Sequence, residues 1–256
     1  LEARVLARLE HPGIVPVHDV GSLPDGRPFY AMKLVRGERL DAAAARLATL
    51  PERLRLFLRV CEPVAFAHAR GVVHRDLKPE NVMVGPFGEV LVLDWGIARV
   101  LSDAGAERSG RGGAEPAGEA TEKAPPAAGT AAGSVLGTPG FMAPEQARGE
   151  DGVDHRADVF ALGALLAALV GETVPASRRL AAIVARATAA RQDERYPDVP
   201  SLAADVTCLL DGEPVTAYRE RFWERAARFS ARHRVALLLV AAYLSARAAI
   251  LLVTGR

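Results

Sequence analysis

The sequence has little of what marks several common classes of protein. Its two cysteines, Cys61 and Cys208, are far apart in apolar surroundings, which excludes a disulfide scaffold or a cysteine-based zinc cluster and fits a reducing compartment. Its 32 basic residues are balanced by 31 acidic ones, so no overall field draws it to nucleic acid, and we expect no nucleic-acid partner. Half of its 256 residues are apolar and a quarter are charged, which excludes a disordered or collagen-like chain.

Hydrophobic periodicity predicts a mixture of helices and short strands. Helical spacing at the N-terminus ends at Pro12, and a helix is expected from Leu40 to about Arg70, with Pro51 as a point where it could break. The run Asp158–Val170 is almost wholly apolar and predicts a buried helix. Strands are expected at 14–20, 29–35, 81–84 and 90–93, and two further helices at 179–189 and 201–210.

Two segments differ from the rest of the chain. Twenty of the 33 residues of 102–134 are Gly, Ala or Pro and none is a large apolar residue, so this segment cannot offset its ordering entropy and we expect a disordered insertion. Residues 214–234 carry six arginines against two glutamates, with aromatic residues between them. Residues 235–253 are mostly apolar and measure roughly 28 Å as a helix, about one hydrocarbon thickness.

Arg247 interrupts this last apolar run. A charge near the bilayer centre costs about 2.5–3.5 kcal/mol, which about ten apolar residues at roughly 0.3–0.6 kcal/mol each can offset. We therefore predict a transmembrane helix at 235–253 behind a basic, aromatic belt. A buried C-terminal helix, or one lying in the membrane interface, is the alternative.

The most informative run is His74-Arg75-Asp76-Leu77-Lys78-Pro79-Glu80-Asn81. Asp94-Trp95-Gly96 follows 18 residues after its aspartate, and Gly137-Thr138-Pro139 and Ala143-Pro144-Glu145 come after the insertion. These motifs, in this order, resemble the signature set of the eukaryotic-like (Hanks-type) serine/threonine protein kinases of bacteria. The resemblance covers residues 1 to about 213. It implies the α+β protein-kinase fold, ATP and Mg²⁺ as cofactors, and proteins as substrates.

The resemblance assigns chemical roles to five residues. Asp76 corresponds to the aspartate that orients the substrate hydroxyl and takes its proton, and Lys78 would place a positive charge on the transferring phosphate of ATP. Asn81 and Asp94 supply hard oxygen atoms, the ligands that Mg²⁺ prefers. Thr138 would bridge toward the catalytic aspartate and lysine.

Other positions match the hinge that holds adenine in this family. Met32 corresponds to the gatekeeper residue, and Lys33 to Val35 would face the adenine. Trp95 replaces the usual phenylalanine and should fill the same slot, so metal binding should survive. The short stretch between Gly171 and Leu180 indicates that one helix of the C-lobe is lost or reduced.

A further group matches parts that support the site. Arg75 resembles the arginine that pairs with a phosphorylated activation segment. Glu145 would form an ion pair with Arg195. Asp158 would hold the backbone of the turn that begins at His74.

The upper half of a kinase site has no counterpart in this sequence. Counting back nine residues from His11 places Glu2 at the C-helix glutamate, whose partner is a lysine behind a glycine-rich loop. No lysine precedes Lys33, and the glycine cluster at 110–113 lies in the insertion without GxGxxG spacing. Either the chain is the C-terminal part of an N-terminally truncated kinase, which a start at Leu1 inside a helix favours, or it is a catalytically deficient pseudokinase scaffold. The intact catalytic set favours the first, and a membrane sensor stalk is weaker than both.

The sequence therefore predicts four parts. They are an N-lobe remnant at 1–36, a C-lobe at 37–213 that contains the insertion 102–134, a juxtamembrane segment at 214–234 and a membrane helix at 235–253. Six arginines before that helix and one after it place the kinase region in the cytoplasm, on a single-pass cell-membrane protein. The implied function is transfer of the ATP γ-phosphate to Ser or Thr of proteins, and this chain alone is expected to be inactive. The hydroxyl residues of the insertion (102, 109, 121, 130 and 134) are either targets of self-phosphorylation or part of a linker.

Overall fold

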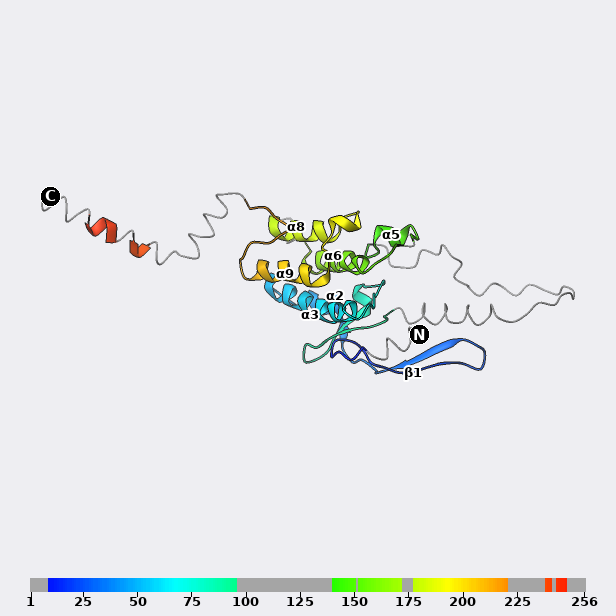
Figure 1. Ribbon diagram of the computed structural model, residues 1–256. Coiled ribbons are helices and arrows are strands. Elements are labelled where there is room, and N and C mark those ends of the chain that lie inside the picture. Colours follow the sequence, from blue (N-terminus) through cyan, green and yellow to red (C-terminus); the bar gives the residue numbers. More distant parts are fainter. Residues whose placement is uncertain are drawn as a thin grey trace. The chain divides into compact units, whose positions relative to one another are not determined.

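The computed structural model describes residues 9–95, 140–150, 152–171, 177–220, 238–240 and 243–247 (Figure 1). The chain divides into two compact units, Leu1–Ala217 and Tyr218–Arg256. In the second unit, 238–240 and 243–247 are helical with exposed side chains. No helix within the described ranges is long and apolar enough to cross a bilayer, and much of the helix predicted at 235–253 lies outside those ranges.

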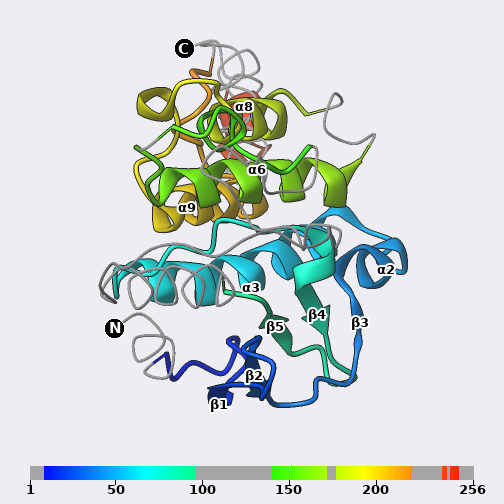
Figure 2. The same ribbon diagram turned by 90° about the vertical axis from the view of Figure 1, so that its right-hand side faces the viewer.

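Two small antiparallel sheets lie on one side of the first unit. The strands β1 (Val17–Ser22) and β2 (Pro28–Met32) form a hairpin. The strands β3 (Glu38–Arg39), β4 (Val82–Val84) and β5 (Val90–Val92) form the second sheet in that order. A parallel bridge between Ile14 and Val92 joins the segment before the hairpin to the edge of this second sheet. In Figure 2 the strands lie on one side of helix α3, and the helices α6, α8 and α9 lie on the other.

The central helix α3 (Leu50–His68) begins at a capping box. The Thr49 hydroxyl accepts the N–H of Glu52 (3.4 Å), and the Glu52 carboxylate accepts the N–H of Thr49 (3.0 Å). Pro51 lies in the first turn, where its missing N–H costs nothing. The helical run predicted from residue 40 is interrupted at 46–49, near Pro51 as expected, and its first part is the short helix α2 (Leu40–Ala45).

The remaining helices are α5 (Pro144–Ala147), α6 (Arg156–Val170), α8 (Arg178–Ala187) and α9 (Val199–Leu210), with a 3₁₀ turn η2 (Gln192–Glu194) before the last. As predicted, α6 is buried along most of its length, because it packs against α3 and α8. Gly163 lets α6 approach α8 closely. A Cβ added there would lie 2.6 Å from the Ala187 Cβ, so only glycine allows this approach.

The predicted fold class is confirmed, with small sheets and a mainly helical remainder. All four predicted strands were wrong at one end or both, by one residue in β4 and β5 and by up to three in β1 and β2. β1 begins at Val17 rather than 14, because Pro16 has no N–H to give to a ladder, and β2 ends at Met32 because residues 33–37 connect it to β3. The insertion 102–134 lies outside the described residues, and the boundaries of the four parts stay predictions.

Candidate active site

The loop between α3 and β4 brings together two predicted catalytic side chains, Asp76 and Lys78, and a predicted metal ligand, Asn81. The Lys78 Nζ lies 2.8 Å from the Asp76 Oδ2. The Asn81 Nδ2 donates to the Asp76 carbonyl at 2.8 Å and to its Oδ2 at 3.1 Å. Pro79 begins the 3₁₀ turn η1 (Pro79–Asn81), in which the Asn81 N–H donates to the Lys78 carbonyl at 3.0 Å. The lysine before this turn and the asparagine at its end contact the same carboxylate oxygen.

Asp158, a fully buried residue in the first turn of α6, holds the backbone of this loop. Its Oδ2 accepts the N–H of His74 (2.7 Å) and its Oδ1 accepts the N–H of Arg75 (2.8 Å). Arg75 has a φ of 68°, a left-handed conformation that costs a non-glycine residue about 1–2 kcal/mol. The two hydrogen bonds to the carboxylate offset this strain, so the contact that the resemblance implied for Asp158 is present.

A third partner of Asp158 was not foreseen from the sequence. The His68 Nε2 lies 2.7 Å from the Asp158 Oδ2, and the His68 Nδ1 is buried without a hydrogen-bond partner among the described residues. Burial alone would raise the pKa of Asp158, but the hydrogen bond from the His68 side chain and that from the His74 backbone help to outweigh it, and the pKa stays below its ordinary value. The only trace of His68 in the sequence is its place six residues before His74.

His74 connects the loop to the end of β5. Its Nε2 lies 2.8 Å from the Leu93 carbonyl, and its Nδ1 accepts the N–H of Asp76 at 3.3 Å. One nitrogen must therefore donate while the other accepts, which assigns a neutral ring with its proton on Nε2. Burial lowers the pKa of His74 more than the nearby carboxylates raise it, in agreement with this neutral form.

Asp94 lies two residues after β5, beside this loop. The Leu93 N–H donates to the Asn81 carbonyl at 2.8 Å, which joins the two candidate metal ligands through adjacent backbone. Asp94 has a φ of 54°, and it lines a small cleft with Met32 and Trp95, together with four apolar residues of the N-terminal segment (Leu9, Ile14, Val15 and Val17).

Asn81 and Asp94 fit a magnesium ion by the chemistry of their donors. The Asn81 Nδ2 is turned to Asp76, so its Oδ1 is the atom left as a hard oxygen ligand. No group of three or more His, Cys, Asp or Glu side chains is placed to hold an ion within the described part of the chain. Since Mg²⁺ is commonly bound through one or two protein ligands, phosphate oxygens and water, a pair of this kind is sufficient.

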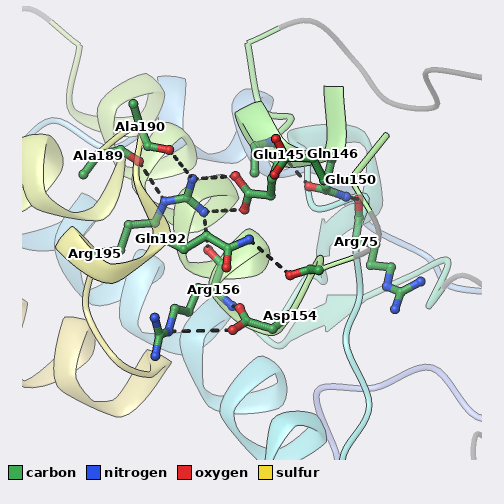
Figure 3. A network of polar contacts seen from close by, with 12 residues as sticks. Arg75, Glu145, Gln146, Glu150, Asp154, Arg156, Ala189, Ala190, Gln192 and Arg195 are labelled. Carbon is green, nitrogen blue, oxygen red and sulfur yellow. Dashed lines mark hydrogen bonds and ion pairs between the residues drawn. The ribbon is translucent and has the colours of Figure 1, made fainter. Parts of the chain in front are cut away.

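The predicted ion pair between Glu145 and Arg195 is present and buried (Figure 3). The Arg195 Nη1 and Nη2 donate to the two Glu145 carboxylate oxygens, both at 2.7 Å. The guanidinium also donates to the carbonyls of Ala189, Arg156 and Ala190, so its donors are well satisfied. Burial alone would raise the pKa of Glu145. The hydrogen bonds and charge of Arg195 outweigh burial, so the pKa of Glu145 lies below its ordinary value.

Figure 3 also shows a contact that sequence reasoning missed. The Gln146 Nε2, next to the ion pair, donates to the Arg75 carbonyl at 2.8 Å. The segment that carries α5 therefore supports the left-handed backbone of the catalytic loop from a second side. A single glutamine gives no sequence signal for such a contact, because its partner is 71 residues away.

The remaining predicted site residues are placed in part. Met32 lines the cleft beside Asp94, and the Lys33 N–H donates to the Pro16 carbonyl at 3.2 Å, which continues the hairpin pairing by one residue. Val35 is half-buried in the connection to β3. Glu2 and Thr138 lie outside the described residues, as does the rest of 96–139, including any partner of Arg75 there.

Two small sheets lie on one side of a mainly helical part, and the loop that carries Asp76, Lys78 and Asn81 lies beside Asp94, two residues after β5. This arrangement is that of a protein kinase. A family model described as a protein kinase domain matches residues 1–213. The chain is 39% identical over 180 residues to the serine/threonine-protein kinase pkn3 of Myxococcus xanthus, over 68% of this chain and 29% of that protein. It is 32% identical over 248 residues to the serine/threonine-protein kinase PknB of Mycobacterium tuberculosis, over 84% of this chain and 36% of the relative.

A third relative is the serine/threonine-protein kinase PknD of Protochlamydia amoebophila, with 33% identity over 192 residues, 69% of this chain and 19% of that protein. The chain therefore belongs to the protein kinase domain family, of the bacterial Hanks type. It spans well under half the length of each of these curated relatives.

Proposed function

We propose that this chain carries the catalytic C-lobe of a protein serine/threonine kinase, which transfers the ATP γ-phosphate to a Ser or Thr hydroxyl of a protein. The observation that carries the proposal is the joint contact of Lys78 and Asn81 with the carboxylate of Asp76, beside Asp94. The names of the relatives support it. Lys78, two residues after the aspartate, supports Ser/Thr rather than tyrosine specificity.

The proposed step is an in-line transfer at the γ-phosphorus. The substrate hydroxyl oxygen bonds to that phosphorus while the bond to the β–γ bridging oxygen breaks, ADP departs with the electron pair, and the hydroxyl proton passes to Asp76. Lys78 neutralises charge on the transferring phosphate and, by its 2.8 Å contact, holds the aspartate in place. Asn81 and Asp94 would hold magnesium, which would supply charge neutralisation on the phosphates.

The nucleotide is proposed to bind with its adenine against the hinge. Met32 would border the adenine, and Lys33 and Val35 would face it. Thr138 would approach Asp76 and Lys78 from the activation segment.

The proposal requires a lysine for Glu2 and a glycine-rich phosphate loop, neither of which is in this sequence. We therefore expect the 256-residue chain alone to transfer no phosphate, and a longer form with residues preceding Leu1 to do so. A pseudokinase scaffold is the alternative, favoured by the same missing lysine.

The test is phosphate transfer by the protein as its native gene expresses it, with radiolabelled ATP and Mg²⁺. Asp76→Asn keeps the shape of the side chain but removes the proton acceptor, so we expect about a 10²- to 10⁴-fold loss of rate. Asp211→Asn, a change at an exposed carboxylate after α9, is the matched control and should leave the rate unchanged. Transfer that survives Asp76→Asn, or its absence from the unsubstituted protein, would contradict the proposal.

We also propose that 235–253 anchors the protein in the cell membrane, with the kinase region in the cytoplasm. The support is the apolar run and the six arginines that precede it. Membrane fractionation after an alkaline carbonate wash tests this, and recovery of the protein in the soluble fraction would overturn it. Mass spectrometry of the self-phosphorylated protein would show whether the hydroxyl residues of 102–134 are modified.

A further inference from the structure

A pocket of about 180 Å³ lies between α2, α3 and α6, and the catalytic loop contributes to its wall through Pro79. Seven of its nine lining residues are apolar, so the pocket offers little to a wholly polar ligand. Its lining includes three alanines, Ala44 and Ala45 of α2 and Ala168 of α6, whose short side chains leave the space open. An apolar cavity of about 150 Å³ is large enough to bind benzene, so this α2–α6 pocket has room for one aromatic ring or a short branched chain.

Arg53 of α3 brings a positive charge to the α2–α6 pocket. Its Nε donates to the Leu47 carbonyl and its Nη1 to the Leu169 carbonyl, both at 3.1 Å. Leu169 lies in the last turn of α6, where helix carbonyls have no partner within the helix, so this bond is part of the helix end. The two bonds fix the guanidinium in place and use two of its five N–H groups, which leaves three for a ligand.

The charge of Arg53 has no counterpart: within the described part of the chain, both of its partners are neutral carbonyls. Asp41 also lines the pocket, but its two carboxylate oxygens accept hydrogen bonds from the Nε (3.2 Å) and Nη2 (3.1 Å) of Arg39. Asp41 is thus already paired. Hydrogen bonds between opposite charges are about twice as strong as neutral ones, so a half-buried guanidinium with free N–H groups beside apolar walls favours an anionic ligand.

We propose that the α2–α6 pocket binds a small carboxylate with an apolar body, an aromatic or branched-chain acid, whose carboxylate pairs with Arg53. The apolar body would contact Pro79, which begins the turn η1 that ends at Asn81. A ligand in this pocket would therefore touch the catalytic loop without entering the candidate active site, because Asp76 and Asp94 do not line the pocket. The site goes beyond the proposed function, and its occupancy can be measured without phosphate transfer.

The first test measures binding alone, in the full chain. Phenylacetate is the probe, because it joins one aromatic ring to a carboxylate; benzyl alcohol and benzylamine carry the same ring with no charge and with a positive charge. Titration followed by ligand-detected NMR should give a dissociation constant of about 1 mM for phenylacetate, the range for a ligand of this size, and values at least about tenfold higher for the other two. Equal binding of the three probes, or no binding of phenylacetate at about 10 mM, would overturn the proposal.

The second test locates the probe. Ala168→Met, at an exposed position of α6 that lines the pocket, fills the space with a longer side chain, so we expect phenylacetate binding to be lost. Ala42→Met makes the same change at an exposed position of α2 that does not line the pocket, and it should leave binding as it is. Binding that survives Ala168→Met would place the probe elsewhere and contradict the inference.

Arg53→Gln separates charge from shape. Loss of the guanidinium should weaken phenylacetate binding at least about tenfold while benzyl alcohol binds as before, and Arg55→Gln, at an exposed position of the same helix, should change neither. A comparison of two probes in one variant is not affected by a general loss of stability. A preference for the carboxylate that survives Arg53→Gln would sink the assignment. Absence of phosphate transfer by the unsubstituted protein, with probe binding intact, would instead count against the proposed function alone.

Discussion

At the scale of single residues, the site depends on one buried carboxylate. Asp158 has no place in the chemistry, yet it accepts the backbone N–H groups of His74 and Arg75 and contacts His68. The left-handed backbone conformation at Arg75 is strained and would not persist without contacts that hold it. The Asp158 carboxylate supplies such contacts by accepting the two backbone N–H groups.

Asp158→Asn should therefore destabilise the fold. The amide keeps the shape of the carboxylate but offers one acceptor instead of two, so one of the two backbone N–H groups is left buried without a partner. We expect the free energy of unfolding in urea to fall by about 1–3 kcal/mol. Asp211→Asn is the control at an exposed position, and an equal effect of both changes would show that the hydrogen bonds contribute nothing.

His74 predicts a pH dependence of stability. Its pKa is lowered by burial, so below the ordinary histidine value of about 6.5 the unfolded chain binds more protons than the folded one. The stability that His74 contributes is fully present above that pH and is lost as the pH falls below it, by up to about 1.4 kcal/mol per pH unit. Asp158 and Glu145, whose pKa values are lowered from the carboxylate range, lose their contribution only at more acidic pH.

Urea unfolding between pH 7.5 and 5 measures this slope. His74→Gln should flatten it, while His18→Gln, at an exposed position in β1, should leave it as it is. If His74→Gln leaves the change of unfolding free energy with pH as it was, His74 does not take up a proton when the protein unfolds, and the prediction is wrong.

At the scale of elements, the contact of α6 with α8 is fixed by Gly163. Gly163→Ala gains about 1 kcal/mol in helix propensity but places a Cβ 2.6 Å from that of Ala187, and overpacking of this kind costs about 1–3 kcal/mol. We expect a net loss of stability. The combination with Ala187→Gly should recover part of the loss in thermal unfolding, because it removes the opposing methyl group. A single variant more stable than the parent would contradict the close approach.

The sequence predicted which elements exist better than where they end. Apolar periodicity was sufficient for α6 and for β4 and β5, whose patterns are strong. It gave the wrong start for β1, because the effect of Pro16 on strand pairing outweighed the pattern of the flanking residues. Contacts between distant segments, such as that of His74 with Asp158 across 84 residues, leave no periodic trace and were foreseen only through the family resemblance.

At the scale of the whole molecule, the end of the first unit is held by hydrogen bonds to the buried carboxylate of Asp205. Asp205 in α9 accepts the backbone N–H groups of Thr216 (2.7 Å) and Ala217 (2.9 Å). The boundary between the two units lies immediately after Ala217. The last residues before the boundary are thus part of the fold of the first unit, and those after it are not needed for these bonds.

Two truncations test this boundary. A chain ending at Ala217 should unfold within about 2 °C of the full chain. A chain ending at Pro214 loses both backbone donors to Asp205, and at about 1–3 kcal/mol its Tm should fall by several degrees. Equal Tm values for the two truncated chains would show that Asp205 does not fix the end of the unit.

The central claim is that Asp76 and Lys78 act as one catalytic group. Its most direct test is a double-variant cycle on the rate of phosphate transfer by the protein from its native gene. If the two side chains work together through their 2.8 Å contact, Asp76→Asn and Lys78→Met should each lower the rate of phosphate transfer by a large factor. The rate of the double variant should then be hardly lower than that of the slower single variant. Losses that multiply would mean two independent contributions and would contradict the account.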